Sequence, residues 1–215
     1  MADELTATDL AADETLADWR YLLNTIVATY RAPSLTEAAA FVTAVAALAA
    51  EGGSDVDVDL RPPGVVRVGL PAPDLVVPGG SVALARATSD RAAGDGLVAV
   101  PSQARLEEIA IDVLDMAAVK PFWQAALAYE DDGADAIVDP LRLGPSVWFQ
   151  PMDALRPERN HIHIDITVPH DVADQRVADV VAAGGTIRYR RDRAFTVLAD
   201  REGNEVCICT WLDRG

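Results

Sequence analysis

The sequence is poor in the residues that most often form disulfides, bind metals or attract polyanions. Its 215 residues include two cysteines, three histidines and 18 lysines and arginines, against 34 aspartates and glutamates. The resulting formal net charge of −16 repels phosphate backbones and anionic lipid head groups. We therefore expect neither a nucleic acid nor a membrane surface among the partners of this protein.

The two cysteines are Cys207 and Cys209. Two apart on a strand, they would point to the same face, and so close a pair rarely forms a disulfide. The chain also begins with an acidic, polar segment, unlike the basic and apolar regions of a signal peptide. Residues 37–50 are apolar, but too short and too rich in alanine to cross a bilayer. These features predict a cytoplasmic protein with reduced thiols.

The first half of the chain mixes strand-like and helix-like patterns. Ser34 and Glu37 form a capping box that marks the start of a helix, and Gly52-Gly53 marks its end. The other expected elements are a strand, a hairpin and a second helix, at residues 24–31, 56–70 and 79–93. Together they predict a small α+β domain.

The second half repeats one order of elements, a strand, a helix and further strands, at a period of about 54 residues. The first copy is expected as a strand at 107–115, a helix at 116–129, and strands at 135–140 and 146–152. The second copy is expected as a strand at 161–168, a helix at 171–184, and strands at 186–191, 194–200 and 205–211. An internal repeat of this kind indicates two similar modules.

Three motifs in this half carry a family resemblance: IDVLDMAAVKPFW, ERNHIHIDITV and VLADREGNEVCI. They resemble the glyoxalase-like branch of the vicinal oxygen chelate (VOC) superfamily. The resemblance implies two paired βαβββ modules that form a cupped sheet and bind a small organic molecule. It also implies a possible lyase or isomerase activity and a homodimer, but it does not fix the chemistry.

The resemblance further implies a metal-ligand set at the positions of Glu108, Gln150, His163 and Cys207. Cys207 stands where the family has a glutamate, so one hard oxygen donor is missing. That change disfavours Mg²⁺, Mn²⁺ and Fe²⁺ and leaves Zn²⁺ or Ni²⁺ as candidates. The alternative is a metal-free cup in which Cys207 is a small buried apolar residue.

All three histidines lie in the stretch RNHIHIDITVPHD. His161, His163 and Asp165 would share one strand face, where His163 could act as general acid or base with Glu108 as its partner. The alternative is that these side chains hydrogen-bond to neighbouring strands. His170 is expected at the entry to the following helix.

Other residues could contact a substrate. Trp148 and Gln150 fall on one strand with Phe149, and Trp123 and Phe122 on one helix, where aromatic residues line a pocket or fill a core. Arg188 is expected to share a strand face with Arg190 and to bind an anionic group, unless this run is a solvated hairpin surface.

Residues 19–93 resemble the pterin-4a-carbinolamine dehydratase family, through TYRAPSLTEAAAFVTAVAALAAE, DVDLRPPGVVRVGL and GGSVALARATS. The family's His-His-Pro motif falls on Ser54, Asp55 and Val56, and its later histidine falls on Pro73. Proline has no acid–base capacity and serine is a poor substitute for imidazole. These replacements predict an inactive domain with a structural or dimerising role.

The expected organisation is an α+β chain with a flexible tail (1–15), a dehydratase-like domain (16–95), a linker (96–104) and a glyoxalase-like VOC domain (105–215). Three functions remain open. The first is a glyoxalase-like enzyme, and the second is a protein that sequesters a small molecule without chemistry. The third is an active 4a-hydroxytetrahydrobiopterin dehydratase that uses Asp55 and Asp57.

Overall fold

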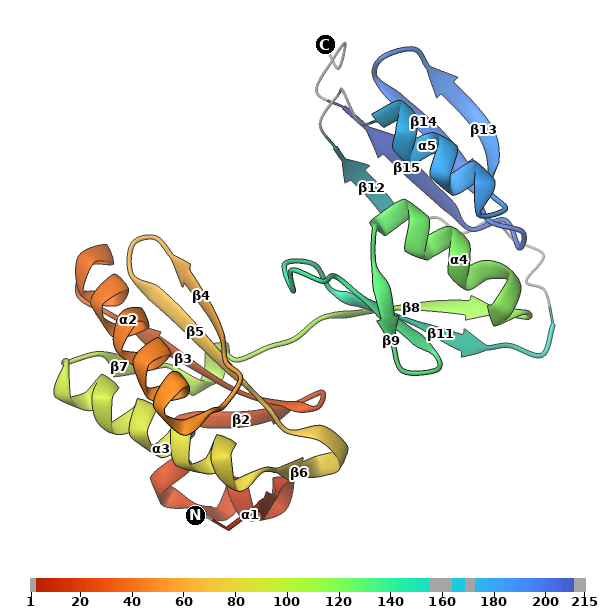
Figure 1. The fold of residues 1–215 in the computed structure, drawn as a ribbon. Coiled ribbons are helices and arrows are strands. Elements are labelled where there is room, and N and C mark those ends of the chain that lie inside the picture. Colours follow the sequence, from red (N-terminus) through yellow and green to blue (C-terminus); the bar gives the residue numbers. More distant parts are fainter. Residues whose placement is uncertain (1–2, 155–163, 169–172, 211–215) are drawn as a thin grey trace. The chain divides into compact units, whose positions relative to one another are not determined.

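The structure is a computed structural model that describes residues 3–154, 164–168 and 173–210. The chain divides into two compact units, Met1–Leu106 and Glu107–Gly215. Both units combine helices with β-sheets (Figure 1), so the predicted α+β class is confirmed.

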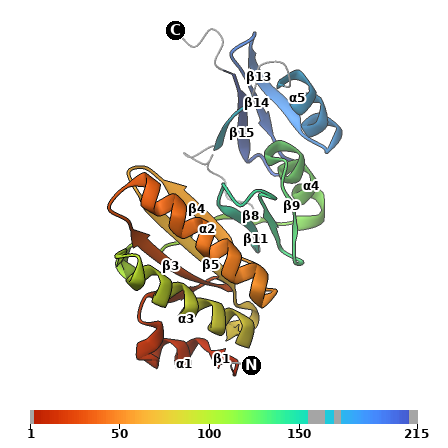
Figure 2. The same cartoon turned by 60° about the vertical axis from the view of Figure 1, so that its left-hand side comes forward.

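The first unit is built on a sheet with strand order β2-β3-β5-β4, and β7 pairs with β3 beside β2. The strands are β2 (Trp19–Leu22), β3 (Thr25–Arg31), β4 (Asp57–Arg61), β5 (Val65–Pro71) and β7 (Val98–Ala99). Helices α2 (Leu35–Gly52) and α3 (Gly79–Gly94) lie side by side over one face of this sheet (Figure 2). Their apolar sides and the inner face of the sheet form one core.

Ser34 is the N-cap of α2, as predicted, and makes one of the two hydrogen bonds of a capping box. Ser34 accepts a hydrogen bond from the Glu37 backbone N–H and donates its hydroxyl to the Glu37 carboxylate. Gly53, at φ 62°, ends the helix in the left-handed conformation that glycine adopts without strain. By length and composition alone α2 could also cross a membrane, which is weak evidence because the core helix of a soluble protein meets the same criterion.

The N-terminal segment does not form the flexible tail that we expected. It contains β1 (Leu5–Thr6), α1 (Ala7–Ala12) and the 3₁₀ turn η1 (Glu14–Leu16), and β1 pairs with β6 (Val76–Val77). Leu10 and Leu16 are buried in the core of the first unit. Arg86 of α3 holds the segment through an ion pair of 2.8 Å with Asp13. The composition of this segment did not reveal its order, because only two buried apolar residues, Leu10 and Leu16, stand among acidic ones.

The expected linker is also largely part of the first unit. Leu97 is buried in its core, and the backbone N–H of Val100 donates to the carbonyl oxygen of Thr29 on β3. The short 3₁₀ turns η2 (Pro73–Leu75) and η3 (Pro101–Gln103) complete this unit. The division between the units falls at Leu106, next to the start of the first repeat.

The second unit contains the βαβββ order twice. The first module comprises β8 (Glu108–Val113), α4 (Met116–Leu127), β9 (Glu130–Asp132), β10 (Ala136–Val138) and β11 (Ser146–Pro151). The second comprises β12 (Ile164–Thr167), α5 (Ala173–Ala182), β13 (Thr186–Arg191), β14 (Phe195–Ala199) and β15 (Glu205–Cys209). The sheet orders are β8-β11-β10-β9 and β12-β15-β14-β13, so in each module the first and last strands lie side by side, in parallel.

Helices α4 and α5 pack against one another in a core shared by both modules (Figure 1). Arg176 of α5 donates to the carbonyl oxygen of Ala126 at 3.0 Å. At Gly185, just after α5, a Cβ atom would lie 2.8 Å from the Phe122 ring, so this position requires glycine for close packing.

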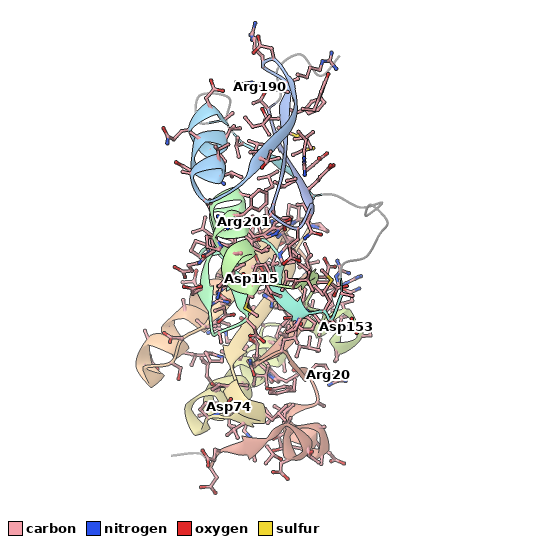
Figure 3. All side chains as sticks on the ribbon, turned by 90° about the vertical axis from the view of Figure 1, so that its right-hand side faces the viewer. Arg20, Asp74, Asp115, Asp153, Arg190 and Arg201 are labelled. Carbon is pink, nitrogen blue, oxygen red and sulfur yellow. The ribbon has the colours of Figure 1, made fainter. Side chains whose placement is uncertain are left out.

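The turn after β14 connects the second module to the first. Asp200 is buried and accepts a hydrogen bond of 3.1 Å from the indole N–H of Trp123 on α4. Glu202, from the same turn, accepts the backbone N–H groups of Leu114 and Asp115 at the start of α4. Figure 3 shows Asp115 and Arg201 close together at this junction, and Arg190 farther along the second module.

Candidate functional site

One face of each sheet in the second unit is covered by helices, and the other we call the helix-free face. On β8, Ile109, Ile111 and Val113 point to the core, so Glu108, Ala110 and Asp112 lie on the helix-free face. On β11, Val147 and Phe149 are in the core. The residues that alternate with them on the helix-free face are Ser146, Trp148 and Gln150.

The strand register decides which of these residues meet. Glu108 lies opposite Ser146, whose hydroxyl donates to the Glu108 carboxylate at 3.2 Å. Gln150 lies opposite Asp112, four residues farther along β8. At roughly 3.3 Å per residue, this offset is about 13 Å. The expected ligands Glu108 and Gln150 therefore share a face but are not neighbours, and they do not fit one metal ion.

The second module repeats this arrangement with a different pair. Asp165 on β12 lies opposite Cys207 on β15. Burial, together with the hydrogen bond to Asp165, raises the pKa of the Cys207 thiol to about 12. The side chain is 7% exposed, so the thiol stays neutral and buried near pH 7. This burial agrees with the expectation of a small buried residue.

Asp112 is a site residue that the sequence-based set omitted. It pairs with Gln150 as Asp165 pairs with Cys207, each pair on the first and last strands of its module. The available signal was the repeated order Ile-Asp-apolar, at residues 111–113 and 164–166. Both aspartates follow an isoleucine of the core face, so alternation directs both to the helix-free face.

The expected catalytic residue His163 lies outside the described residues, as do His161 and His170. Within the described part of the chain, no group of three or more His, Cys, Asp and Glu side chains could hold a metal ion. The proposed ligand set can therefore be tested only through Glu108, Gln150 and Cys207, and β8 and β11 do not bring the first two together.

The aromatic residues have different environments. Phe122, Trp123 and Phe149 are buried in the core, in accord with the core alternative. Trp148 is half-buried on the helix-free face, where its cross-strand partners are Ala110 on β8 and Ala136 on β10. Of the four, Trp148 alone is placed to meet a ligand on that face.

Arg188 and Arg190 of β13 differ in their pairing with β14. A bulge between Ile187 and Tyr189 places Arg188 outside the regular pairing, and its side chain is exposed. Arg190 forms an ion pair with Asp174 of α5, so it lies on the helix side of the sheet. A small cavity of about 110 Å³ on that side is lined in part by Arg190. The bulge is set by packing, which the alternating sequence does not reveal.

In the first unit, Asp57 on the edge strand β4 lies opposite Gly69 and is exposed. Asp55 is exposed beside β4, and Ser54 lies near the start of α3, because a Cβ on Gly80 would be 3.1 Å from its hydroxyl oxygen. Pro73 begins η2. These residues offer carboxylates and one hydroxyl, and no imidazole.

Comparisons with known proteins concern the second unit. Residues 108–209 match the profile of the glyoxalase-like domain, and no curated protein matches the chain. Similar solved structures include the fosfomycin resistance protein FosX from Mesorhizobium loti (16% identity, 49% of this chain, 91% of that chain, TM-score 0.42).

Two further structures have the same level of similarity. One is the fosfomycin resistance protein FosX from Listeria monocytogenes in complex with Mn(II) and a sulfate ion (17% identity, 50% of this chain, 90% of that chain, TM-score 0.41). The other is a possible glyoxalase from Bacillus cereus (11% identity, 49% and 97%, TM-score 0.40). The pterin dehydratase resemblance of the first unit finds no support among these comparisons. The second unit is thus similar in sequence to glyoxalase-like domains and contains their duplicated βαβββ order.

Proposed function

We propose that the second unit binds a small organic molecule on the helix-free faces of its sheets. The observation that carries the proposal is the repeated polar pair, Asp112 with Gln150 and Asp165 with Cys207, in corresponding strands of the two modules. Gln150 and Asp165 are exposed and Asp112 is half-buried. Polar groups on a face that no helix covers are available to orient a ligand.

If this site is catalytic, we infer a proton transfer of the lyase or isomerase type, with His163 as acid or base and Glu108 as its partner. The support is chemical: imidazole titrates near neutral pH, and Glu108 is an exposed carboxylate on the helix-free face. No step through a metal is proposed, because Glu108 and Gln150, two ligands implied by the family resemblance, do not fit one ion. Elemental analysis of the purified protein tests for bound Zn²⁺, Ni²⁺ or Mn²⁺.

A thermal-shift screen of a metabolite library tests binding, with Asp112→Asn and Gln150→Ala as variants. Compounds that stabilise the wild type and lose this effect in both variants support the site. Compounds that stabilise all three proteins equally, or a library without any hit, would contradict it. Each hit is then incubated with the protein in D₂O, where NMR detects deuterium entering an acidic C–H position. Enzymatic proton transfer requires this exchange in the wild type and its loss in His163→Ala.

Sequestration without chemistry is the second candidate, and the neutral, buried Cys207 thiol favours it over thiolate chemistry. A ligand that remains unchanged in D₂O and still binds His163→Ala would establish this reading. The two buried cysteines, which form no disulfide, suit a reducing compartment, and this supports a cytoplasmic location.

For the first unit we propose a role in homodimer formation rather than catalysis. Residues 38–50 of α2 carry no charged side chain, and Ala39, Thr43, Ala46 and Ala50 of this segment are exposed. Two strongly acidic chains can approach there without opposing carboxylates. Light scattering should give twice the mass of the chain for the wild type and a monomer for Ala46→Glu. A monomeric wild type would refute the proposal.

Loss of water from the 4a-carbinolamine at the buffer rate would exclude dehydratase activity through Asp55 and Asp57.

A further inference from the structure

Trp148 occupies the middle of the helix-free face in the first module. It lies on β11 between β8 and β10, so it has a cross-strand neighbour on each side. Its own strand alternates, and the core residues beside it are Val147 and Phe149. A half-buried indole on a sheet face without a helix leaves part of its ring accessible to a ligand.

The cross-strand neighbours of Trp148 are small. Ala110 and Ala136 are its partners, and both have only a methyl side chain. Ala110 is exposed, and Ala136 and Trp148 are half-buried. Since directly opposed residues have Cβ atoms about 5 Å apart, larger side chains at these positions would pack against the indole. The two alanines therefore place little side-chain volume beside the indole.

The charges on this face have one sign. Along the strands, the rows on either side of Trp148 hold Glu108 with Ser146 and Asp112 with Gln150. Alternation places Glu130 and Asp132 of the edge strand β9 on the same face. The four strands of the first module, β8, β9, β10 and β11, contain no lysine or arginine. An anionic ligand would therefore meet carboxylates, whereas a cation or an N–H donor would find acceptors on both sides of the indole.

We infer that the ligand of this site is a planar aromatic molecule bearing a protonated amine or N–H donors, stacked on Trp148. The inference rests on the proposed small-molecule function and names the class of ligand. The ring would lie against the indole between the two alanines, and its cationic group would reach Glu108 or Asp112. An aromatic face also attracts a cation directly, which adds to the charge preference.

The full-length protein is titrated by calorimetry with tryptamine and with indole-3-propionate, two probes that share a ring and differ in charge. We expect tryptamine to bind at least about tenfold more tightly. Trp148→Ala and Ala110→Leu should each weaken tryptamine about tenfold, by removing the platform or by filling the space beside it. Ala117→Leu, the same change at an exposed position of α4, is the matched control and should leave affinity unchanged.

Equal affinity for both probes, failure of tryptamine to bind, or full affinity in folded Trp148→Ala and Ala110→Leu would overturn the inference. These outcomes differ from failure of the proposed function. If an anionic library compound binds and loses its effect in Asp112→Asn, the site stands and the ligand class is wrong. If no library compound depends on Asp112 and Gln150, the proposed function itself fails.

Discussion

The hydrogen bond between Trp123 and Asp200 should be a main source of stability in the second unit. It joins α4 of the first module to the turn after β14, and both side chains are buried. Trp123→Phe removes one donor to a carboxylate, which costs about 1.5–3 kcal/mol in general. Asp200 keeps three other donors from Glu202 and Asn204, so the cost should be near the lower limit. The smaller ring leaves part of a cavity, which adds about 1 kcal/mol.

We therefore expect Trp123→Phe to lower the free energy of unfolding of the second unit by about 2–3 kcal/mol. Native-state hydrogen exchange measures this change for each segment, and amides of β14 and β15 should exchange roughly 30- to 150-fold faster. Amides of the first unit, a separate compact unit, are the internal reference. Trp148→Phe is the matched control, because Trp148 is half-buried on the opposite face. If the two variants accelerate exchange equally, the assigned role of the Asp200 bond is wrong.

Three further predictions follow from packing and ionisation. Gly185→Ala should cost about 1–3 kcal/mol, measured as a lower melting temperature, because its Cβ would clash with the Phe122 ring. Leu16→Ala should cost about 2–5 kcal/mol in urea denaturation, and a neutral effect would mean that the N-terminal segment is detached. The pKa of Cys207, raised from 9.0 to about 12, should lower stability as pH rises from about 9 to 12, by at most about 1.4 kcal/mol per pH unit. In Cys207→Ala the same pH titration should be less steep; equal slopes would contradict the shift.

Local signals were sufficient for most of the fold. The N-cap residue Ser34 and the glycine at position 53 define both ends of α2. Period-2 alternation identified β4 and β5, because one face of each strand packs on a core. The repeated order of elements predicted two similar modules, and their sheet orders agree.

Elements that depend on distant partners were not predictable in this way. The strand β9, Glu130–Asp132, consists of three exposed acidic residues and forms only because β10 pairs with it. The N-terminal segment is ordered through Leu10, Leu16 and the ion pair of Asp13 with Arg86, which lies far along the chain. Such contacts leave no periodic pattern in a short segment.

The candidate site also depends on contacts between residues that are distant in the sequence. Alternation assigns Glu108, Asp112 and Gln150 to one face, since a strand has a period of two. It cannot give the register between β8 and β11, which are joined through a helix and two other strands. A shift of four residues preserves the face but moves a side chain by about 13 Å, which is too far to bind the same metal ion. The register makes Asp112 the partner of Gln150, so variants at position 112 should affect ligand binding more than variants at Glu108. Comparison of Asp112→Asn with Glu108→Gln in the same thermal-shift screen tests this order, and a larger effect of Glu108→Gln would favour the ligand set implied by the family over the observed register.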